Sequence, residues 1–187
     1  MKTIAKLVLA AAVFATGGCS SYYKPPPPAF HAALNQAYRF DSGDVARVTV
    51  FDQAELTAAY SIDKAGYLSM PLIGDVPARG RTAVELEGEV TRRLANGYLN
   101  DPDVTISVEQ YRPFFIMGEV AQGGQYTYVP GMTVQKAIAA SGGYTPRAEQ
   151  ASVDITRQIG GEVVTGRVLA SDPILPGDTL YVRERWF

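Results

Sequence analysis

The stretch that decides the fold lies at residues 62–74, which read Ile62-Asp63-Lys64-Ala65-Gly66-Tyr67-Leu68-Ser69-Met70-Pro71-Leu72-Ile73-Gly74. The Asp63 side chain can accept a following backbone N–H, and Gly66 can take a positive φ, so these residues predict a turn. Tyr67, Leu68 and Met70 predict a short strand, which Pro71 ends because proline has no amide hydrogen to donate to a sheet. Gly74 closes the stretch as a second turn.

A helix is predicted next, from about Thr82 to Tyr98. Thr82 and Glu85 have the spacing of a capping box, in which each side chain satisfies a backbone amide at the start of the helix. The apolar residues of this helix fall on or near one stripe: Val84, Leu86, Val90, Leu94 and Tyr98. After Asp101-Pro102, residues 103–108 alternate apolar and polar side chains, which predicts a strand returning beside the strand of residues 67–70.

The second half of the chain again predicts short strands and one capped helix. Strands are predicted at residues 114–117, 126–129, 151–156, 162–168 and 179–182, with a hairpin turn at Gly160-Gly161. Thr133 caps a second helix, which ends at Gly142-Gly143. Gly43-Asp44 and Gly177-Asp178 each precede a strand. The predicted fold class is α+β, with two small β-grasp-like domains, each a mixed sheet with one main helix.

The first 37 residues are not expected to belong to either domain. Residues 1–18 carry lysines, a short apolar run and then small residues, which is the layout of a secretory signal peptide. Cys19, the single cysteine, follows where a bacterial lipoprotein signal is cleaved and the thiol is lipidated. The lipoprotein motif usually has leucine three residues before the cysteine, and this chain has Thr16 there. The alternative is therefore an ordinary signal peptide with a passenger cysteine nearby. Residues 19–37 contain the proline run 25–28, which predicts a semi-rigid tether or, alternatively, a ligand for an aromatic groove.

Composition excludes several classes of function. The chain has 187 residues, a formal net charge of −2 and one histidine. Basic residues form no stripe that would favour nucleic acid, and no spacing typical of a metal site is present. The carboxylate pairs Asp41/Asp44 and Asp101/Asp103 lie in turns, where local backbone hydrogen bonds explain an aspartate. We therefore expect no catalytic residues, no metal, no cofactor and no enzymatic activity.

Two sets of residues carry a resemblance to a known family. The first runs from Asp63 and Gly66 through Pro71-Leu72-Ile73-Gly74, Gly80-Arg81-Thr82, the helix, Asp101-Pro102 and Val104-Thr105-Ile106. It resembles the polysaccharide export domain of the Wza-like outer-membrane lipoproteins. The second comprises Ile116-Met117-Gly118-Glu119-Val120, Pro130-Gly131-Met132-Thr133 and Ala137-Ile138-Ala139-Ala140-Ser141-Gly142-Gly143. It resembles the soluble-ligand-binding β-grasp (SLBB) domain that follows in that family.

The resemblance implies domain boundaries and site residues. We expect a signal peptide at 1–18, a lipidated cysteine and tether at 19–37, a polysaccharide export domain at 38–111 and an SLBB domain at 112–187. Cys19 would be the lipid attachment site, and Ser20 after it implies the outer membrane. The other family-motif residues are expected to be structural: Asp63, Gly66, Pro71, Leu72, Gly74, Gly80, Thr82, Pro102, Gly118, Gly131, Gly142 and Gly143.

The resemblance also implies a function and partners. The chain would be a lipid-anchored subunit of an oligomeric ring that faces the periplasm and conducts capsule or exopolysaccharide outward. Its partners would be other copies of itself, the polysaccharide cargo and an inner-membrane polysaccharide copolymerase. Larger family members continue into an amphipathic helix that forms the pore, whereas this sequence ends at Phe187. We therefore add the hypothesis that a separate outer-membrane β-barrel completes the route.

Two other classes of function remain open at this point. One is a ligand-binding module in which Tyr126, Tyr128 and Tyr144 stack on a sugar or another small molecule. The other is a structural spacer that bridges the two membranes. The final aromatic residues, Trp186 and Phe187, are expected either at a membrane interface or packed against the last strand.

Overall fold

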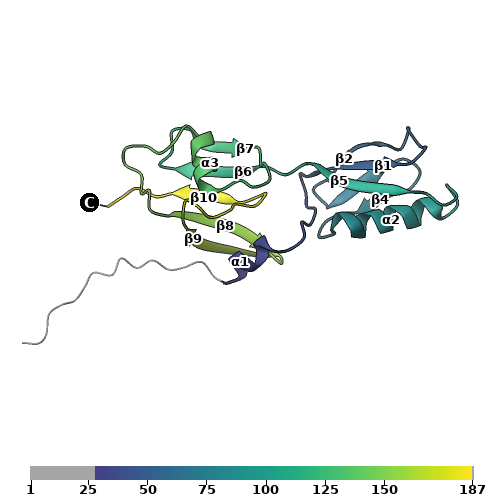
Figure 1. Ribbon diagram of the computed structural model, residues 1–187, viewed down its shortest axis with the longest axis horizontal. Helices are drawn as coiled ribbons and strands as arrows, with labels where there is room; N and C mark the ends of the chain where they lie inside the picture. Colours follow the sequence, from purple (N-terminus) through teal and green to yellow (C-terminus); the bar gives the residue numbers. More distant parts are fainter. Residues whose placement is uncertain (1–27, 187) are drawn as a thin grey trace, which may run out of the picture.

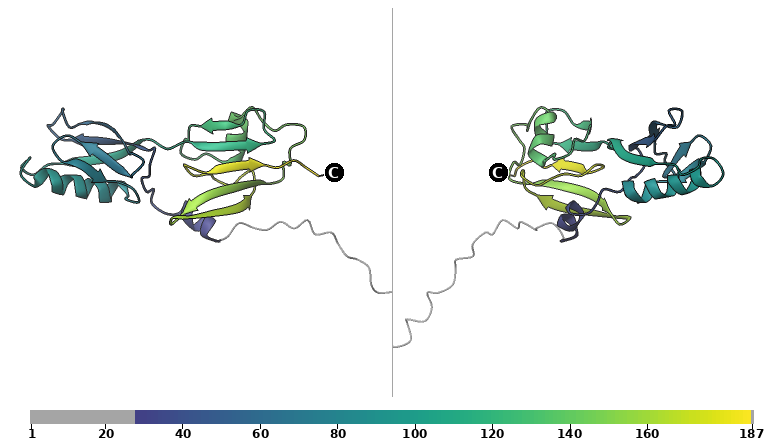
Figure 2. Two further views of the ribbon diagram at one scale, coloured as in Figure 1. Left: turned by 180° about the vertical axis from the view of Figure 1, so that it is seen from behind. Right: turned by 45° about the vertical axis from the view of Figure 1, so that its right-hand side comes forward.

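The computed structural model describes residues 28–186. These residues form two units, each with its own sheet and hydrophobic core, joined end to end along the long axis of the molecule (Figures 1 and 2). The predicted signal peptide, Cys19, most of the tether and Phe187 lie outside the described residues. No helix among residues 28–186 combines the length and apolar character needed to cross a membrane.

The first unit is built from antiparallel strands and one helix. Its three-stranded sheet has the order β2-β1-β5, and a separate hairpin pairs β3 with β4. The helix α2 lies along one side of these strands (Figure 1). The elements are β1 (Val45–Val50), β2 (Ala58–Ser61), β3 (Tyr67–Met70), β4 (Gly74–Pro77), α2 (Ala83–Ala95) and β5 (Val104–Gln110).

The predicted strand at 103–108 is present as β5, but its predicted neighbour was wrong. β5 pairs with β1, placing Val48 opposite Ile106, and both side chains are buried. β3 pairs instead with β4, across the turn that Pro71 begins. The reason is that the short β3–β4 connection closes a local hairpin, whereas the alternating apolar residues of β1 and β5 bury a common face.

The capping box of α2 is confirmed, because the Thr82 hydroxyl accepts the Glu85 N–H and the Glu85 carboxylate accepts the Thr82 N–H. The predicted apolar stripe is only partly right. Its three central residues are buried: Leu86, Val90 and Leu94. Val84 is exposed because it lies two residues before Leu86, on nearly the opposite side of a helix. Tyr98 is also exposed, since the helix ends at Ala95.

The second unit contains a five-stranded sheet in the order β7-β6-β10-β8-β9. β10 runs parallel to β6 and antiparallel to β8, so this sheet is mixed. Thr133 caps the helix α3, as predicted, and α3 contributes Val134 and Ile138 to the core. The elements are β6 (Phe114–Gly118), β7 (Gly124–Tyr126), α3 (Val134–Ala140), β8 (Val153–Ile159), β9 (Glu162–Val168) and β10 (Thr179–Val182).

The α+β fold class is confirmed, with small sheets and one main helix in each unit. The first unit differs from the prediction in one respect, because all of its strand pairs are antiparallel and its sheet is not mixed. The difference arises because β5, which follows α2, enters the sheet beside β1 in the opposite direction.

The end of the predicted tether is helical. The short helix α1 (Pro28–Leu34) begins at a proline, which is tolerated in the first turn because that amide has no intrahelical acceptor. Phe30 is buried in the core of the second unit, and the Arg157 guanidinium lies 4.7 Å from the centre of its ring. The tether prediction is therefore wrong for residues 28–34, since burial of Phe30 draws this segment onto β8.

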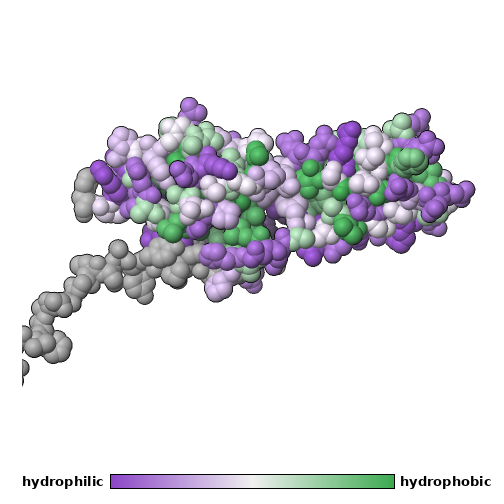
Figure 3. All heavy atoms as spheres, in the orientation of Figure 1, coloured by the Kyte–Doolittle hydropathy of each residue, from purple (hydrophilic) through white to green (hydrophobic). Residues whose placement is uncertain are grey.

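The surface is mostly hydrophilic on the face shown in Figure 3, with small hydrophobic patches over both units. Trp186 is 96% exposed, so it does not pack against the last strand. The sheet of the second unit also leaves one face uncovered, where Phe115, Met117 and Tyr181 are each more than 40% exposed. Met117 and Tyr181 are direct neighbours on the parallel strands β6 and β10.

Candidate functional site

A cleft of about 710 Å³ lies where the two units meet. Its walls come from α1 and the segment after it, the residues just before α2, the connection from β5 to β6, the segment between β7 and α3, the end of β8 with the turn that follows, and the residues just before β10. The aromatic and charged side chains that line it are those of Tyr38, Arg39, Asp41, Arg79, Tyr111, Arg112, Tyr128 and Arg157, together with Phe40. The cleft therefore draws residues from distant parts of the sequence to one place.

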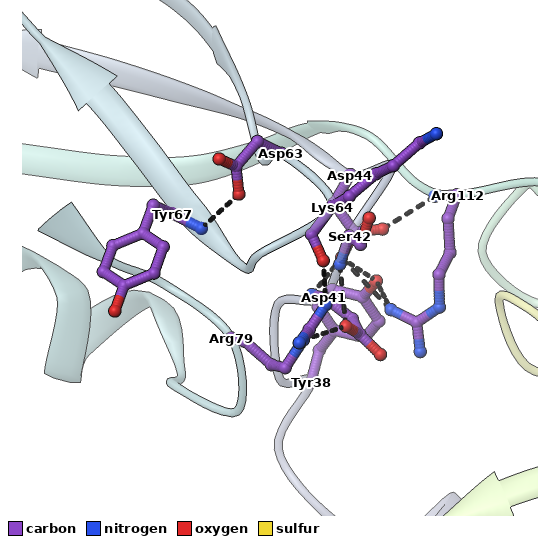
Figure 4. Close-up of polar contacts among 9 residues, drawn as sticks. All are labelled: Tyr38, Asp41, Ser42, Asp44, Asp63, Lys64, Tyr67, Arg79 and Arg112. Atoms are coloured by element: carbon purple, nitrogen blue, oxygen red, sulfur yellow. Dashed lines mark hydrogen bonds and ion pairs between the residues drawn. The ribbon is translucent and has the colours of Figure 1, made fainter. Parts of the chain in front are cut away.

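A buried carboxylate organises the side of the cleft that belongs to the first unit. Asp44 is fully buried in the turn before β1, where its Oδ2 accepts the Asp41 N–H at 2.8 Å and the Tyr38 hydroxyl at 2.6 Å. Arg112 donates its backbone N–H to Asp44 Oδ1 at 2.7 Å and its Nη1 to Asp44 Oδ2 at 3.2 Å. Figure 4 shows these side chains converging. One carboxylate thus ties a turn of the first unit to the connection between the units.

The second unit contains a matching arrangement before β10. Asp178 is 1% exposed, and its Oδ2 accepts the Leu175 N–H at 2.7 Å. Arg157, 4% exposed, makes a bidentate contact with it, with Nε 2.9 Å from Oδ1 and Nη2 2.7 Å from Oδ2. Burial raises the pKa of the Asp178 carboxyl, and the hydrogen bonds from Arg157 oppose that rise. The remaining guanidinium nitrogen, Nη1, donates to the carbonyl of Phe30 in α1.

The repeated Gly-Asp pattern in the sequence therefore corresponds to repeated geometry. In both units the aspartate follows a glycine with positive φ, accepts the amide three residues earlier and binds an arginine, and a strand begins directly after it. This geometry lets a carboxylate be buried, since backbone and guanidinium donors replace its lost hydration. The two turns therefore lead into the central strand of each sheet, β1 in the first unit and β10 in the second.

Arg112 joins the two turns. Its side chain binds Asp44 in the first unit and passes over Gly177 in the second, where a Cβ atom would come within 2.8 Å of the Arg112 Nε. Gly177 also has a φ of +84°, which side chains rarely adopt. A larger residue at this position would therefore separate the arginine from the second unit.

A row of aromatic rings crosses the junction. Tyr38 contacts Tyr111 edge to face at 4.9 Å between ring centres, and Tyr111 contacts Tyr128 at 5.4 Å. Burial, followed by the hydrogen bond to Asp44, raises the pKa of Tyr38, and burial also raises that of Tyr128. Both hydroxyls therefore stay neutral at physiological pH, so the cleft presents aromatic rings rather than phenolate charges.

The three tyrosines named as candidates for sugar stacking do not form one site. Only Tyr128 lines the cleft. Tyr126 stacks on Phe114 and donates its hydroxyl to the Gln122 carbonyl. The hydroxyl of Tyr144 is buried and has no hydrogen-bond partner among the described residues. Spacing along the sequence could not distinguish these environments.

The family-motif residues lie at the ends of elements rather than in one pocket. Among them, only Gly80 lines the cleft. The Asp63 carboxylate accepts the Tyr67 N–H across the turn that contains Gly66, as predicted. The others are placed as follows: Pro71 and Leu72 in the β3–β4 turn, Gly74 at the start of β4, Thr82 at the cap of α2, Pro102 before β5, Gly118 at the end of β6, Gly131 before α3, and Gly142 and Gly143 after α3.

The main residues that sequence reasoning missed are Tyr38, Arg112 and Arg157. The Gly-Asp repeat pointed to the two aspartates, but nothing in the sequence identified which arginine each would bind. Asp41 was weighed with Asp44 as a carboxylate pair, and it instead accepts the Ser42 N–H and the Arg79 Nε. Local backbone bonding and ion pairing thus account for both aspartates.

Comparison with known families divides the chain at the same junction. Residues 32–109 match the family described as polysaccharide biosynthesis/export protein, and residues 113–168 match the SLBB domain. Together, a polysaccharide export match followed directly by an SLBB match supports a protein of the Wza-like polysaccharide export family. The two matched segments meet around Arg112, so the Asp44–Arg112 contact lies where one domain gives way to the next.

Curated relatives have names that agree with this family. The exopolysaccharide production protein ExoF of Rhizobium meliloti is 35% identical over 96 residues, which cover 50% of this chain and 23% of ExoF. The EPS I polysaccharide export outer membrane protein EpsA of Ralstonia solanacearum is 32% identical over 133 residues, covering 57% of this chain and 35% of EpsA. The similarity to EpsA of Ralstonia nicotianae is 27% over 148 residues, or 64% of this chain and 38% of that protein. The chain therefore matches about a quarter to two-fifths of these relatives.

Proposed function

We propose that this protein is an outer-membrane lipoprotein, anchored through Cys19 and facing the periplasm, that forms part of an export channel for capsule or exopolysaccharide. The observation that carries the proposal is the ordered pair of matches, polysaccharide export at residues 32–109 followed by SLBB at residues 113–168. The names of the relatives, two of them called outer membrane export proteins, support the same function.

The mechanism is passive conduction through a ring of identical subunits. Each subunit is a pair of domains, and the contacts of Arg112 with Asp44 and Gly177 restrict bending between them. Subunits of fixed shape favour a closed ring, because cyclic symmetry needs the same angle at every interface. The direction of transport would come from polymer synthesis and from an inner-membrane polysaccharide copolymerase docked on the periplasmic end.

The open sheet face of the second unit is suited to contact between subunits. We define this surface by Phe115, Met117 and Tyr181, which lie on adjacent strands and are 41–47% exposed. Exposed apolar clusters on a soluble domain favour association, since burial of their surface releases water. Tyr181→Glu would place a charge beside Met117 on this surface without removing a core side chain.

The experiment measures cell-surface polysaccharide in a deletion strain that is complemented with the intact gene or with Cys19→Ala. We expect polymer to be lost in the deletion strain, restored by the intact gene and not restored by Cys19→Ala. A Tyr181→Glu allele tests the ring, and Tyr98→Glu, an exposed tyrosine in the first unit, is its matched control.

Each result separates one part of the proposal from another. Unchanged polymer in the deletion strain would refute the export function and favour a structural spacer. Full restoration by Cys19→Ala would refute the need for the lipid anchor while leaving export intact. Native electrophoresis of the complex in detergent should show that Tyr181→Glu, unlike Tyr98→Glu, reduces the oligomer to smaller species.

A further inference from the structure

We propose that the cleft between the two units is a binding site for a short segment of an acidic polysaccharide, held by stacking on Tyr128 and by the guanidinium groups of Arg39 and Arg79. This inference rests on the proposed function for its choice of a saccharide, and it adds the site and the charge of the sugar. The cleft has the shape, the aromatic surface and the charge for such a ligand.

The size of the cleft fits a few sugar rings. Its volume of about 710 Å³ lies within the range of roughly 300–1,000 Å³ that is typical of small-molecule sites. The walls come from two domains, which is a common location for a binding site. A segment of a long chain could enter because the cleft is open to solvent at the junction rather than enclosed in one core.

The aromatic surface of the cleft is fixed in place. Tyr111 holds the Tyr128 ring by an edge-to-face contact, and Tyr38 holds Tyr111 in the same way. Tyr38 is fixed in turn by its hydrogen bonds to Asp44 and Arg112. A ring that is already ordered loses little conformational entropy when it binds a ligand. The C–H face of a sugar ring can therefore pack on Tyr128 at low cost.

The cleft offers exposed guanidinium groups to an anion. Four arginines line it, with Asp41 as the single carboxylate among the lining residues. Arg112 and Arg157 are neutralised by the buried Asp44 and Asp178 behind them. The remaining two arginines, Arg39 and Arg79, are each about half exposed, and they pair with Glu85 and Asp41 at or near the surface rather than with a fully buried carboxylate.

Arg39 and Arg79 have donors to spare. Arg39 makes both of its hydrogen bonds through Nη1, to the Gly80 carbonyl and to Glu85, so Nε and Nη2 are unused within residues 28–186. Arg79 uses Nε and Nη2, on Asp41 and on the Lys64 carbonyl, which leaves Nη1 without an acceptor in the same part of the chain. The Arg39–Glu85 pair is exposed on both sides, so exchanging Glu85 for a sugar carboxylate costs little. Guanidinium groups bind carboxylates through paired, charge-assisted hydrogen bonds.

The test is calorimetric titration of the full-length protein, purified in detergent, with tetragalacturonate as an acidic probe and maltotetraose as a neutral one. We expect tetragalacturonate to bind at least tenfold more tightly than maltotetraose. Raising the salt from about 0.05 M to 0.5 M should weaken binding of the acidic probe, because salt screens exposed charges. Failure of tetragalacturonate to bind, or equal affinity for both probes, would overturn the inference.

Matched variants locate the site. Tyr128→Leu and Arg39→Gln should each weaken tetragalacturonate binding at least fivefold. Tyr128→Phe should preserve binding, since it keeps the ring and the Tyr128 hydroxyl makes no hydrogen bond within the described region; it also controls for folding. Tyr98→Leu and Arg47→Gln should have no effect, because these residues lie outside the cleft and Arg47 forms an exposed pair with Glu109 that resembles Arg39–Glu85. Unaltered binding by both Tyr128→Leu and Arg39→Gln would refute this location.

The outcome is independent of the test of export. If the purified protein binds tetragalacturonate in a way that requires Tyr128, but deletion of the gene leaves polymer output unchanged, the site is supported and the export function is rejected. Polymer output that depends on the gene, with no tetragalacturonate binding, would support export and overturn the site.

Discussion

Replacing the buried Asp178 by asparagine should destabilise the second unit strongly. Asp178 and Arg157 are 1% and 4% exposed, and the two side chains meet through two hydrogen bonds of 2.7 and 2.9 Å. Asparagine has almost the same shape but carries no charge. The variant would therefore leave a buried guanidinium without a counter-charge, while keeping most of the packing.

The expected loss follows from the burial of the pair. Removing one partner of a buried ion pair costs about 3–5 kcal/mol. The carbonyl oxygen of the new amide could still accept the Leu175 N–H and one guanidinium hydrogen bond, so we expect the lower end, about 3 kcal/mol, or roughly a hundredfold in the unfolding equilibrium. The loss should also loosen α1, because Arg157 donates to the carbonyl of Phe30 and lies over its ring.

The assay is urea denaturation followed by circular dichroism, with the free energy of unfolding compared between variants. Glu109→Gln is the matched control, since its partner Arg47 forms a pair in which the side chains are 49% and 44% exposed. Exposed pairs contribute about 0–1 kcal/mol. The double variant Arg157→Met/Asp178→Leu should recover much of the stability, because no buried charge is left unpaired. If Asp178→Asn destabilises no more than Glu109→Gln does, the argument from burial is wrong.

Three further predictions concern backbone space, charge and capping. Gly118→Ala should lose about 2–5 kcal/mol of unfolding free energy, since Gly118 has a φ of +90° and a Cβ there would overlap the backbone carbonyl of Val182 on the paired strand. Gly131→Ala is the control. Gly131 has a φ of +78° but open space around it, so this variant should lose only about 1–2 kcal/mol. The hydrogen bond from Arg93 holds the pKa of Glu89 below its usual value, so this stabilisation is present above the unfolded pKa of about 4.3 and is lost as the pH falls through the lower folded pKa. Denaturation at pH 7 and pH 3.5 should accordingly show a smaller pH-dependent loss for Glu89→Gln than for the native chain, and an equal loss would contradict this assignment. Thr82→Ala should cost about 1 kcal/mol by removing the cap of α2, measured by the same urea titration, and no change would show that water replaces the cap.

Local signals in the sequence predicted most of the elements correctly. The Thr82–Glu85 capping box, the Asp63–Gly66 turn, the Thr133 cap and the Gly160-Gly161 hairpin all involve residues within a few positions of each other. Such interactions depend on backbone geometry over a single turn, so the sequence contains the information needed to place them. Val84 and Tyr98 were wrongly expected on the buried stripe of α2. Val84 lies at the wrong angle around the helix axis, and Tyr98 follows the end of the helix at Ala95.

Partners distant in the chain could not be predicted in this way. β5 pairs with β1 rather than with β3, because the choice depends on which faces are buried together once the β3–β4 hairpin has closed. Residues 28–34 form a helix because Phe30 finds a place in a core whose other members come after residue 113. Neither result follows from local pattern, since each depends on contacts between segments far apart in the sequence.

The sequence by itself determined the α+β class, the positions of turns and caps, and the family, because these depend on residue type and short spacing. Only the tertiary structure determined which residues line the cleft. Tyr38, Arg79, Tyr128 and Arg157 line it because the central strand of each sheet begins after a buried aspartate and Arg112 joins the two turns. The physical reason is that a buried carboxylate must find donors wherever the fold supplies them, and for Asp44 and Asp178 the arginines lie 68 and 21 residues away.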